Sequence, residues 1–337
     1  MFLSFIVPVY NVEQYLDEYL RSLVNQDIPP DDYEIICIND GSTDGSLKTL
    51  QSYAQRHQNI RVIDKINEGV SVARNVGLDK ARGEYIWMVD SDDFIAANCL
   101  GSIKARIIEN HLERLKIGTY RFGETLTAEE VAAVNKNTVC VNSHFYDSSV
   151  WNSILSRRFL QEHLCCFHYP ELTNGEDSIF MFELTAHSPL CAEMNIPIYF
   201  YRTRLNSATT ANADATKERQ LNSYFLAAKI MKRHYDNGTG RIRDSANLLM
   251  SFIWYTMNGC ALLSGAKRKA WLRKAKQAGL YPFVRPDACS HIRSYQTTRT
   301  DIIGKIYDKV YINTHRPWGF WTMCGLAKLI EWKHRLK

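Results

Sequence analysis

The sequence has 337 residues, of which 45% are hydrophobic and 23% are charged, and its net charge is +5 at pH 7. This length accommodates about two domains, and the composition excludes a disordered, collagen-like or fibrous chain. The nine cysteines are odd in number and form no C-x-x-C pair, which argues against a zinc ribbon or a secreted disulfide framework and favours a reducing, cytoplasmic compartment.

The first hundred residues alternate short apolar segments with amphipathic ones. We expect strands at 3–10, 33–38, 60–64 and 85–89, and helices at 12–25, 46–56 and 70–81. Asn11 is the expected N-cap of the first helix and Asp44 that of the second. Continuously apolar strands that alternate with helices predict a mostly parallel sheet with helices on both faces.

The rest of the chain contains fewer strand signals. Residues 146–164 have the apolar spacing of a helix, and helices are also expected at 220–235 and 246–278. The polar stretch 205–219 marks the predicted boundary. We therefore expect an α/β domain over 1–210, with halves 1–100 and 101–210, and an all-α domain over 220–337.

Positive charge is concentrated in the C-terminal tail. Residues 267–337 contain 16 Lys/Arg and 4 Asp/Glu, a net charge of +12, whereas the other 266 residues contain 25 and 32, a net charge of −7. The excess indicates either an anionic partner or a solvated basic face. Trp318, Phe320, Trp321 and Trp332 among these cations resemble an interfacial segment, which predicts attachment to an anionic membrane surface. The alternative is a helix packed on the catalytic domain or on a partner subunit.

Two further segments bear on membranes. Residues 2–10 are apolar but short, contain Pro8 and follow no basic region, so we expect no signal peptide. Residues 245–266 have no charged side chain, but polar residues interrupt them. This pattern favours a helix buried in the protein over one that spans a bilayer.

Polar side chains follow three of the predicted strands, at the edge where ligands of parallel sheets bind. The strands run into PVYN at 8–11, NDG at 39–41 and DSDD at 90–93. Asp90 and Asp92, two apart on an extended segment, point the same way and need a cation. Their oxygens suit Mg²⁺ or Mn²⁺ with phosphates completing the shell; the alternative is capping by Asp92 or Asp93.

Three other polar groups have both a functional and a structural interpretation. Asp40 is placed either to stabilise its own turn or to accept an N–H group from a base. In the run NEGVSVARNVG at 67–77, Gly69 permits close backbone approach at a helix N-terminus that favours anions. Packing explains Ala73 and Gly77 but not the polar residues of that run. Glu176 and Asp177 begin a predicted helix, where an acid either caps the helix or serves as a general base.

Together these motifs resemble the family 2 glycosyltransferases of bacterial surface-polysaccharide type, which have the GT-A fold. The matching segments are PVYN (8–11), NDGSTDGS (39–46), NEGVSVARNVGLDKARGEYIWMVDSDD (67–93) and GEDSIF (175–180). The match is specific over 1–100, looser over 150–209 and absent beyond 219. It implies a Rossmann-like, mostly parallel sheet covered by helices, followed by a C-terminal all-α region.

The resemblance implies a metal-dependent, inverting enzyme that moves a sugar from a nucleotide-diphosphate donor, usually a UDP-sugar, to a hydroxyl of a glycan or lipid-linked acceptor. It implies Mn²⁺ or Mg²⁺ held by Asp92 and Asp90, with Asp177 as the base and Glu176 orienting the acceptor. The implied donor-binding residues are Pro8, Val9, Tyr10, Asp40, Asn67, Gly69, Ser71, Asn75, Asp90, Ser91, Arg202, Arg204 and Ser207. The resemblance also implies a cytoplasmic protein, or one attached peripherally to the inner leaflet of the plasma membrane, and no nucleic-acid partner.

Other classes fit less well. A glycoside hydrolase has no use for the nucleotide-type strand ends, and a nucleotidyltransferase would need a Gly-rich loop after the first strand. The P-loop motif G-x-x-x-x-G-K-[ST] is absent from the sequence. A non-catalytic module that binds a nucleotide-sugar or glycan stays open as the alternative, although such a module would be expected to lose Asp92 or Asp177.

Overall fold

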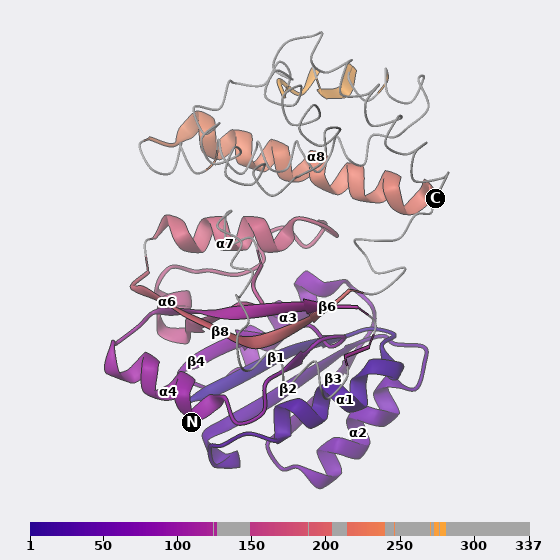
Figure 1. Cartoon of the computed structure of the whole chain (residues 1–337). Coiled ribbons are helices and arrows are strands. Elements are labelled where there is room, and N and C mark those ends of the chain that lie inside the picture. The colour runs from indigo at the N-terminus through magenta and orange to yellow at the C-terminus, as the bar shows by residue number, and fades with distance from the viewer. Residues whose placement is uncertain are drawn as a thin grey trace, which may run out of the picture. The chain divides into compact units, whose positions relative to one another are not determined.

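The computed structural model describes residues 1–123, 125–126, 149–187, 189–203, 214–239, 246, 270, 273–275 and 277–280. The chain divides into two compact units (Figure 1). Of the described residues, the first unit holds 1–170 and 183–203, and the second holds 171–182 and those from 214 onward. The predicted domain limits at 210 and 220 stay a prediction, and the basic tail lies outside the described residues except for 270, 273–275 and 277–280.

A mixed sheet forms the centre of the first unit, in the order β3-β2-β1-β4-β7-β6-β8-β5. Its strands are β1 (Leu3–Val9), β2 (Tyr33–Asp40), β3 (Ile60–Lys65), β4 (Tyr85–Met88), β5 (Phe94–Ile95), β6 (Arg114–Phe122), β7 (Ser153–Ser156) and β8 (Cys191–Arg202). The first four strands pair in parallel, as predicted. Beyond β4 the sheet is mixed, because β7 is antiparallel to β4 and β6, and β5 to β8.

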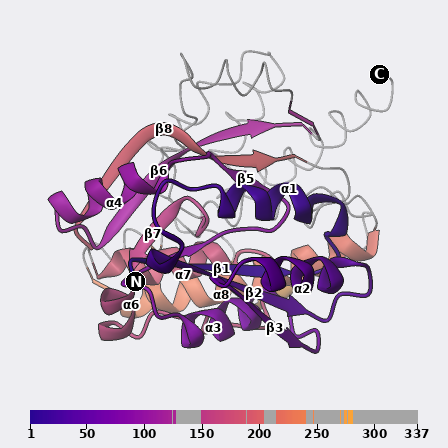
Figure 2. The same ribbon diagram turned by 90° about the horizontal axis from the view of Figure 1, so that it is seen from below.

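The helices confirm the predicted ranges in the N-terminal third and add elements beyond it. They are α1 (Glu13–Val24), α2 (Ser46–Arg56), α3 (Val70–Lys80), α4 (Leu100–Glu109), α6 (Arg157–Glu162), α7 (Glu176–Ala186) and α8 (Asp214–Asn237), with a 3-10 turn at Pro30–Asp32. Figure 2 shows α1 and α2 on one face of the β1–β3 region and α3 on the other.

Successive side chains of β1 point to opposite faces of the sheet, which explains why both faces are covered by a helix. Phe5 and Val7 belong to the core that the apolar side of α1 covers, while Ile6 faces α3. The contact with α3 is close: a Cβ atom at Gly77 would lie 2.3 Å from Cγ2 of Ile6. Gly77 is therefore explained by packing.

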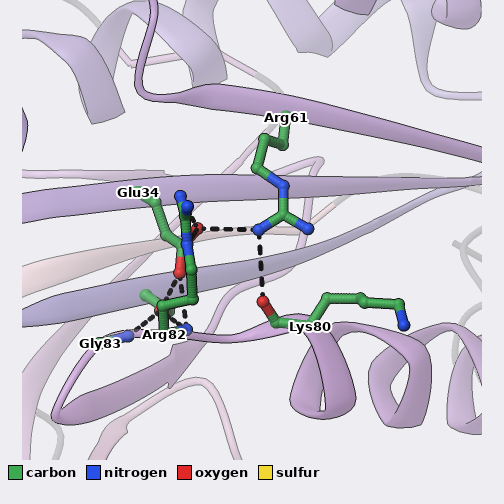
Figure 3. A network of polar contacts seen from close by, with 6 residues as sticks. Glu34, Arg61, Lys80, Arg82 and Gly83 are labelled. Atoms are coloured by element: carbon green, nitrogen blue, oxygen red, sulfur yellow. Dashed lines mark hydrogen bonds and ion pairs between the residues drawn. The ribbon is translucent and has the colours of Figure 1, made fainter.

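One buried glutamate, Glu34, lies at the amino edge of this sheet, where the parallel strands begin, and bonds several groups there. Oε1 of Glu34 accepts hydrogen bonds from the Ser4 hydroxyl (2.8 Å) and the Arg82 backbone N–H (2.7 Å). Oε2 accepts from the guanidinium groups of Arg82 (2.9 Å) and Arg61 (3.2 Å), as Figure 3 shows. Arg61 also donates to the Lys80 carbonyl at 3.3 Å. Glu34 thus fastens the end of α3 and the connection to β4.

The helix predicted over 146–164 is wrong for its described middle part. Ser153–Ser156 form strand β7, between β4 and β6, and only Arg157–Glu162 are helical. Ile154 and Leu155 are both buried because both faces of this strand are covered. A short run that is apolar on both faces has no period that separates a strand from a helix.

The predicted N-cap Asn11 is also wrong. Helix α1 begins at Glu13 with Val12 at its N-cap, and Asn11 has a left-handed backbone with φ +51°. Its carboxamide oxygen instead accepts from the Thr43 backbone N–H at 2.8 Å. Gly45 is the N-cap of α2, although Asp44 does accept from the Ser46 N–H at 3.0 Å.

Helix α8 confirms the helix predicted over 220–235. In the part of the chain that the structure describes, no helix has the length and apolar character needed to cross a membrane. Residues 245–266, apart from 246, and most of the helix predicted over 246–278 lie outside the described residues.

Candidate functional site

Asp40 ends strand β2 and holds the loop between β3 and α3. The residue is 3% exposed, and Oδ1 accepts from the Lys65 ammonium (2.6 Å) and the Glu68 backbone N–H (3.0 Å). Oδ2 accepts from the Gly69 N–H at 2.8 Å. Asp40 therefore holds a loop nearly thirty residues away, whereas the structural interpretation placed its contacts in its own turn. Its predicted contact with a base stays a prediction.

The loop held by Asp40 leads into the N-terminus of α3. Gly69 has φ +93°, a conformation that side chains other than glycine rarely adopt. Asn67 is exposed, whereas Ser71, in the first turn of α3, is buried. The Ser71 hydroxyl finds no hydrogen-bond partner among the described residues. A buried hydroxyl of this kind, beside the free N–H groups that begin a helix, can accommodate an anionic ligand.

The segment Asp90–Asp93, which we call the acid turn, follows β4. The Asp90 carboxylate is 29% exposed and bonds the Arg74 guanidinium at 2.9 Å. The Ser91 hydroxyl donates to the Pro8 carbonyl at 2.8 Å, which ties the turn to β1. Asp92 is partly exposed and Asp93 is buried. The structure thus brings the predicted residues of β1 and β4 to one edge of the sheet.

Strand β8 holds the acid turn from the other side. The Asp93 carboxylate accepts from the Tyr199 hydroxyl (2.6 Å) and the Arg202 backbone N–H (2.7 Å). The Tyr199 oxygen also accepts from the Asp90 N–H at 3.2 Å, and Nε of Arg202 donates to the Asp92 carbonyl at 2.9 Å. Asp93 is therefore not the helix cap of the alternative interpretation, because its carboxylate accepts hydrogen bonds from β8.

Three carboxylates lie within four residues at the acid turn, and their mutual repulsion acts on the buried Asp93. Burial, followed by the charges of Asp92 and Asp90, raises the pKa of Asp93 well above its usual value. Burial and then Asp93 and Asp90 likewise raise the pKa of Tyr199 and of Tyr201. Like charges crowded at a buried strand end favour a cation beside them.

Asp90 and Asp92 fit a divalent ion only if water and substrate phosphates supply its other ligands. Within the described ranges, no group of three or more His, Cys, Asp or Glu side chains is placed to hold a metal. Mg²⁺ keeps several water molecules and binds one or two carboxylates together with substrate phosphates. The acid turn therefore fits a metal that arrives with a diphosphate, and does not fit a site made by protein ligands alone.

Arg202 and Asn75 contact protein groups. The buried Arg202 guanidinium lies 5.1 Å from the Tyr15 ring centroid and 4.8 Å from that of Phe122, and it pairs with Glu18. The Asn75 side chain donates to the Phe167 carbonyl (3.0 Å) and accepts from its N–H (2.9 Å). The predicted diphosphate and nucleotide contacts of Arg202 and Asn75 stay predictions.

The second unit holds the predicted base. Helix α7 begins at Glu176, so Glu176 and Asp177 lie in its first turn, after Gly175 with φ +86°. The Ser223 hydroxyl of α8 accepts from the N–H groups of Thr173 and Asn174, both at 3.0 Å. This contact fixes the loop that leads into α7. Arg204 and Ser207 lie outside the described residues.

Sequence reasoning missed Tyr199, Phe167, Lys65 and Ser223. Lys65 stands next to the NEG motif and could have been found as the cation nearest to Asp40. No local signal marks Tyr199 or Phe167, because their partners lie 106 and 92 residues away along the chain.

Comparisons with known proteins agree with this architecture. Residues 4–159 match the family model described as glycosyl transferase family 2. The "Uncharacterized glycosyltransferase EpsJ" of Bacillus subtilis is 29% identical over 296 residues, which cover 84% of each chain. "Poly(ribitol-phosphate) beta-N-acetylglucosaminyltransferase TarS" of Staphylococcus aureus is 29% identical over 226 residues, 64% of this chain but only 38% of TarS.

Solved structures share the fold. TarS residues 1–349 in complex with UDP-GlcNAc superpose with a TM-score of 0.65 at 22% identity, covering 99% of this chain and 92% of that one. The mannosyltransferase PcManGT of Pyrobaculum calidifontis, solved with GDP-Man and Mn²⁺, gives a TM-score of 0.55 at 15% identity, covering 95% and 87%. The similarity to TarS extends the resemblance from motifs to the GT-A fold.

Proposed function

We propose that the chain, whose residues 4–159 match the glycosyl transferase family 2 model, transfers a sugar from a UDP-sugar to a hydroxyl group of a surface glycan or lipid-linked acceptor, with inversion. The acid turn at the carboxyl edge of the sheet carries the proposal, because ligands of such sheets bind there. The structure of TarS with UDP-GlcNAc supports a UDP-sugar as the donor.

The nucleoside would lie against Pro8, Val9, Tyr10 and Asp40. Tyr10, at the end of β1, is 50% exposed and offers a ring for stacking. The donor would continue past Asn67, Gly69 and Ser71 towards Asp90 and Ser91. The N-terminus of α3 and the Ser71 hydroxyl, which has no hydrogen-bond partner in the part of the chain that the structure describes, support a diphosphate in this direction.

Asp92 and Asp90 would hold Mn²⁺ or Mg²⁺ together with the diphosphate. When bound, the ion supplies Lewis-acid neutralisation of the negative charge on the leaving group. The two carboxylates and the mutual repulsion of the acids at the acid turn support this assignment, as does the Mn²⁺ in the PcManGT structure.

Asp177 would act as the general base. It takes the proton of the acceptor hydroxyl while the acceptor oxygen bonds the anomeric carbon from the face opposite the diphosphate. The bond between that carbon and the diphosphate oxygen breaks, and UDP leaves with the electron pair. Glu176 would orient the acceptor.

A thermal-shift panel of UDP-, GDP- and dTDP-sugars, each with and without Mn²⁺, tests the donor and the metal. We expect one UDP-sugar to stabilise the protein only with Mn²⁺, and Asp92→Asn to abolish that shift. Stabilisation by a GDP- or dTDP-sugar instead would overturn the UDP assignment. Stabilisation without turnover on any acceptor would favour a non-catalytic binding module.

The base is tested separately. Asp177→Asn should lower kcat by roughly 1,000-fold while donor binding stays intact, because a general base contributes about that factor. Glu176→Gln is the matched control on the same helix turn and should act mainly on the KM of the acceptor. Equal loss of kcat in both variants would contradict the assignment.

The basic tail is proposed to attach the protein to anionic membranes, where a lipid-linked acceptor would be available. The full chain should sediment with anionic liposomes, and truncation of Pro317–Lys337 should abolish this binding. Unchanged sedimentation after truncation would remove this proposal.

A further inference from the structure

The side chains of β8 that bond the acid turn form a second layer behind the proposed metal ligands. Tyr199 and Arg202, which we call the β8 clamp, make four hydrogen bonds to this turn. The Tyr199 oxygen joins both ends of the turn, since it accepts from the Asp90 N–H and donates to the Asp93 carboxylate. Arg202 bonds the Asp92 carbonyl directly, at the residue expected to bind the metal.

The clamp is itself held rigidly. Tyr199 is fully buried, and its ring stacks on Trp151 with centroids 4.7 Å apart. The Arg202 guanidinium lies near the rings of both Tyr15 and Phe122 and pairs with Glu18. Side chains that packing and hydrogen bonds fix in this way can hold a neighbouring ligand close to its productive geometry.

We propose that Tyr199 and Arg202 are positioning residues that orient the Asp92 carboxylate for the divalent ion, without touching the donor. The inference rests on the proposed metal role of Asp92. It also gives Arg202 a function other than diphosphate contact. Two of the four hydrogen bonds hold backbone atoms, the Asp90 N–H and the Asp92 carbonyl, and two hold the Asp93 carboxylate. The direction of the Asp92 carboxylate therefore depends on β8.

Tyr199→Phe is the sharpest test, because it removes one oxygen and keeps the stacked ring. Tyr85→Phe is the matched control: Tyr85 is the first residue of β4, and its hydroxyl donates to the Leu112 carbonyl at 2.9 Å, at the end of β4 away from the acid turn. Tyr199→Phe loses two hydrogen bonds of a phenolic oxygen and Tyr85→Phe loses one, so both variants should lose some thermal stability.

Mn²⁺ affinity separates the two roles. Free Mn²⁺ is titrated by electron paramagnetic resonance in the presence of saturating UDP, and UDP binding without metal is measured by calorimetry. We expect Tyr199→Phe to raise the Kd of Mn²⁺ about tenfold, as loss of an outer-shell partner typically does. Tyr85→Phe should leave that Kd unchanged, and neither variant should alter metal-free UDP binding.

Arg202→Lys provides a second variant if Tyr199→Phe does not fold. It keeps the charge and the backbone N–H but removes Nε, and we expect the Kd of Mn²⁺ to rise severalfold with metal-free UDP binding unchanged. Weaker UDP binding without metal would indicate direct diphosphate contact and overturn the positioning role of Arg202.

Two further outcomes are distinguishable. If the wild-type protein binds Mn²⁺ with UDP and Tyr199→Phe has the same Kd, the clamp is purely structural and this inference is wrong. If the wild-type protein does not bind Mn²⁺ with UDP, the proposed metal site fails, and the inference fails with it.

Discussion

The two ends of strand β2 use similar chemistry for different purposes. Glu34, near its start, and Asp40, at its end, are both buried, both paired with a cation and both bonded to backbone N–H groups. Glu34 fastens the end of α3, and Asp40 fastens its beginning. One strand thus anchors both ends of the same helix through two carboxylates.

The two edges differ in what surrounds these acids. At the amino edge, arginines on two neighbouring segments neutralise the single charge of Glu34 (Figure 3). At the carboxyl edge, Asp90, Asp92 and Asp93 add further negative charge within a few residues of one another. The contacts of Glu34 serve stability, whereas we propose that the carboxylates of the carboxyl edge, where Arg74 pairs with Asp90, bind a cation.

Replacing Asp92 should produce the largest effect, and it should be on catalysis. We expect Asp92→Asn to lower kcat/KM roughly 1,000-fold, about 4 kcal/mol, because it removes the proposed main metal ligand. Release of UDP from the donor identified by the panel measures the rate. Unfolding in urea serves as the control, and an unchanged rate would remove the carboxyl edge as the active site.

Replacing Glu34 should give the opposite pattern. Glu34→Gln weakens several charge-assisted hydrogen bonds and brings an amide nitrogen up to N–H donors at a buried position, so we expect a cost of about 3 kcal/mol of unfolding free energy. The kcat of the folded variant should equal that of the wild type. A fall in kcat without loss of stability would contradict the division of roles between the edges.

Replacing Asp40 should lower both the stability of the protein and its affinity for UDP. In Asp40→Asn the amide nitrogen meets N–H donors where a carboxylate oxygen accepted them, so we expect a loss of about 2 kcal/mol of unfolding free energy. Because the β3–α3 loop also borders the proposed donor site, UDP affinity should fall about tenfold, which is about 1.4 kcal/mol. Unaltered UDP binding, measured by calorimetry on the folded variant, would restrict Asp40 to a structural role.

The contribution of Glu34 should depend on pH. Burial by itself raises the pKa of Glu34, but hydrogen bonds from Ser4 and Arg82 and the charge of Arg82 outweigh it, so the pKa lies below the usual glutamate value. The stabilisation is therefore present above the ordinary glutamate pKa and is lost as the pH falls through the lowered one. The stability gap between wild type and Glu34→Gln should narrow over that acidic range; a constant gap would contradict this account.

The smallest effect is expected at Arg61. Its side chain is 36% exposed and makes one contact with Glu34 at 3.2 Å, while Arg82 retains its own bonds to the same oxygen. Arg61→Met should therefore cost less than about 1 kcal/mol of unfolding free energy. A loss as large as that of Glu34→Gln would show that Arg61, and not Arg82, neutralises the glutamate.

The sequence alone determined the N-terminal half of the sheet and its motifs. The strands and helices through residue 89 were predictable because each buries an apolar face or stripe that neighbours in the chain reveal. The acids of the carboxyl edge were predictable too, since parallel strands bring their ends together without reference to distant partners.

Only the tertiary structure decided the rest. Strand β7 is a strand because β4 and β6 pair with it, and the short strand β5 and the irregular β8 likewise depend on their partners. The roles of Asp93, Tyr199 and Arg202 depend on contacts across more than one hundred residues. The spacing of apolar residues along the chain indicates which side of a helix or strand is buried. It does not indicate which distant group bonds a buried carboxylate, because only the folded chain brings the two together.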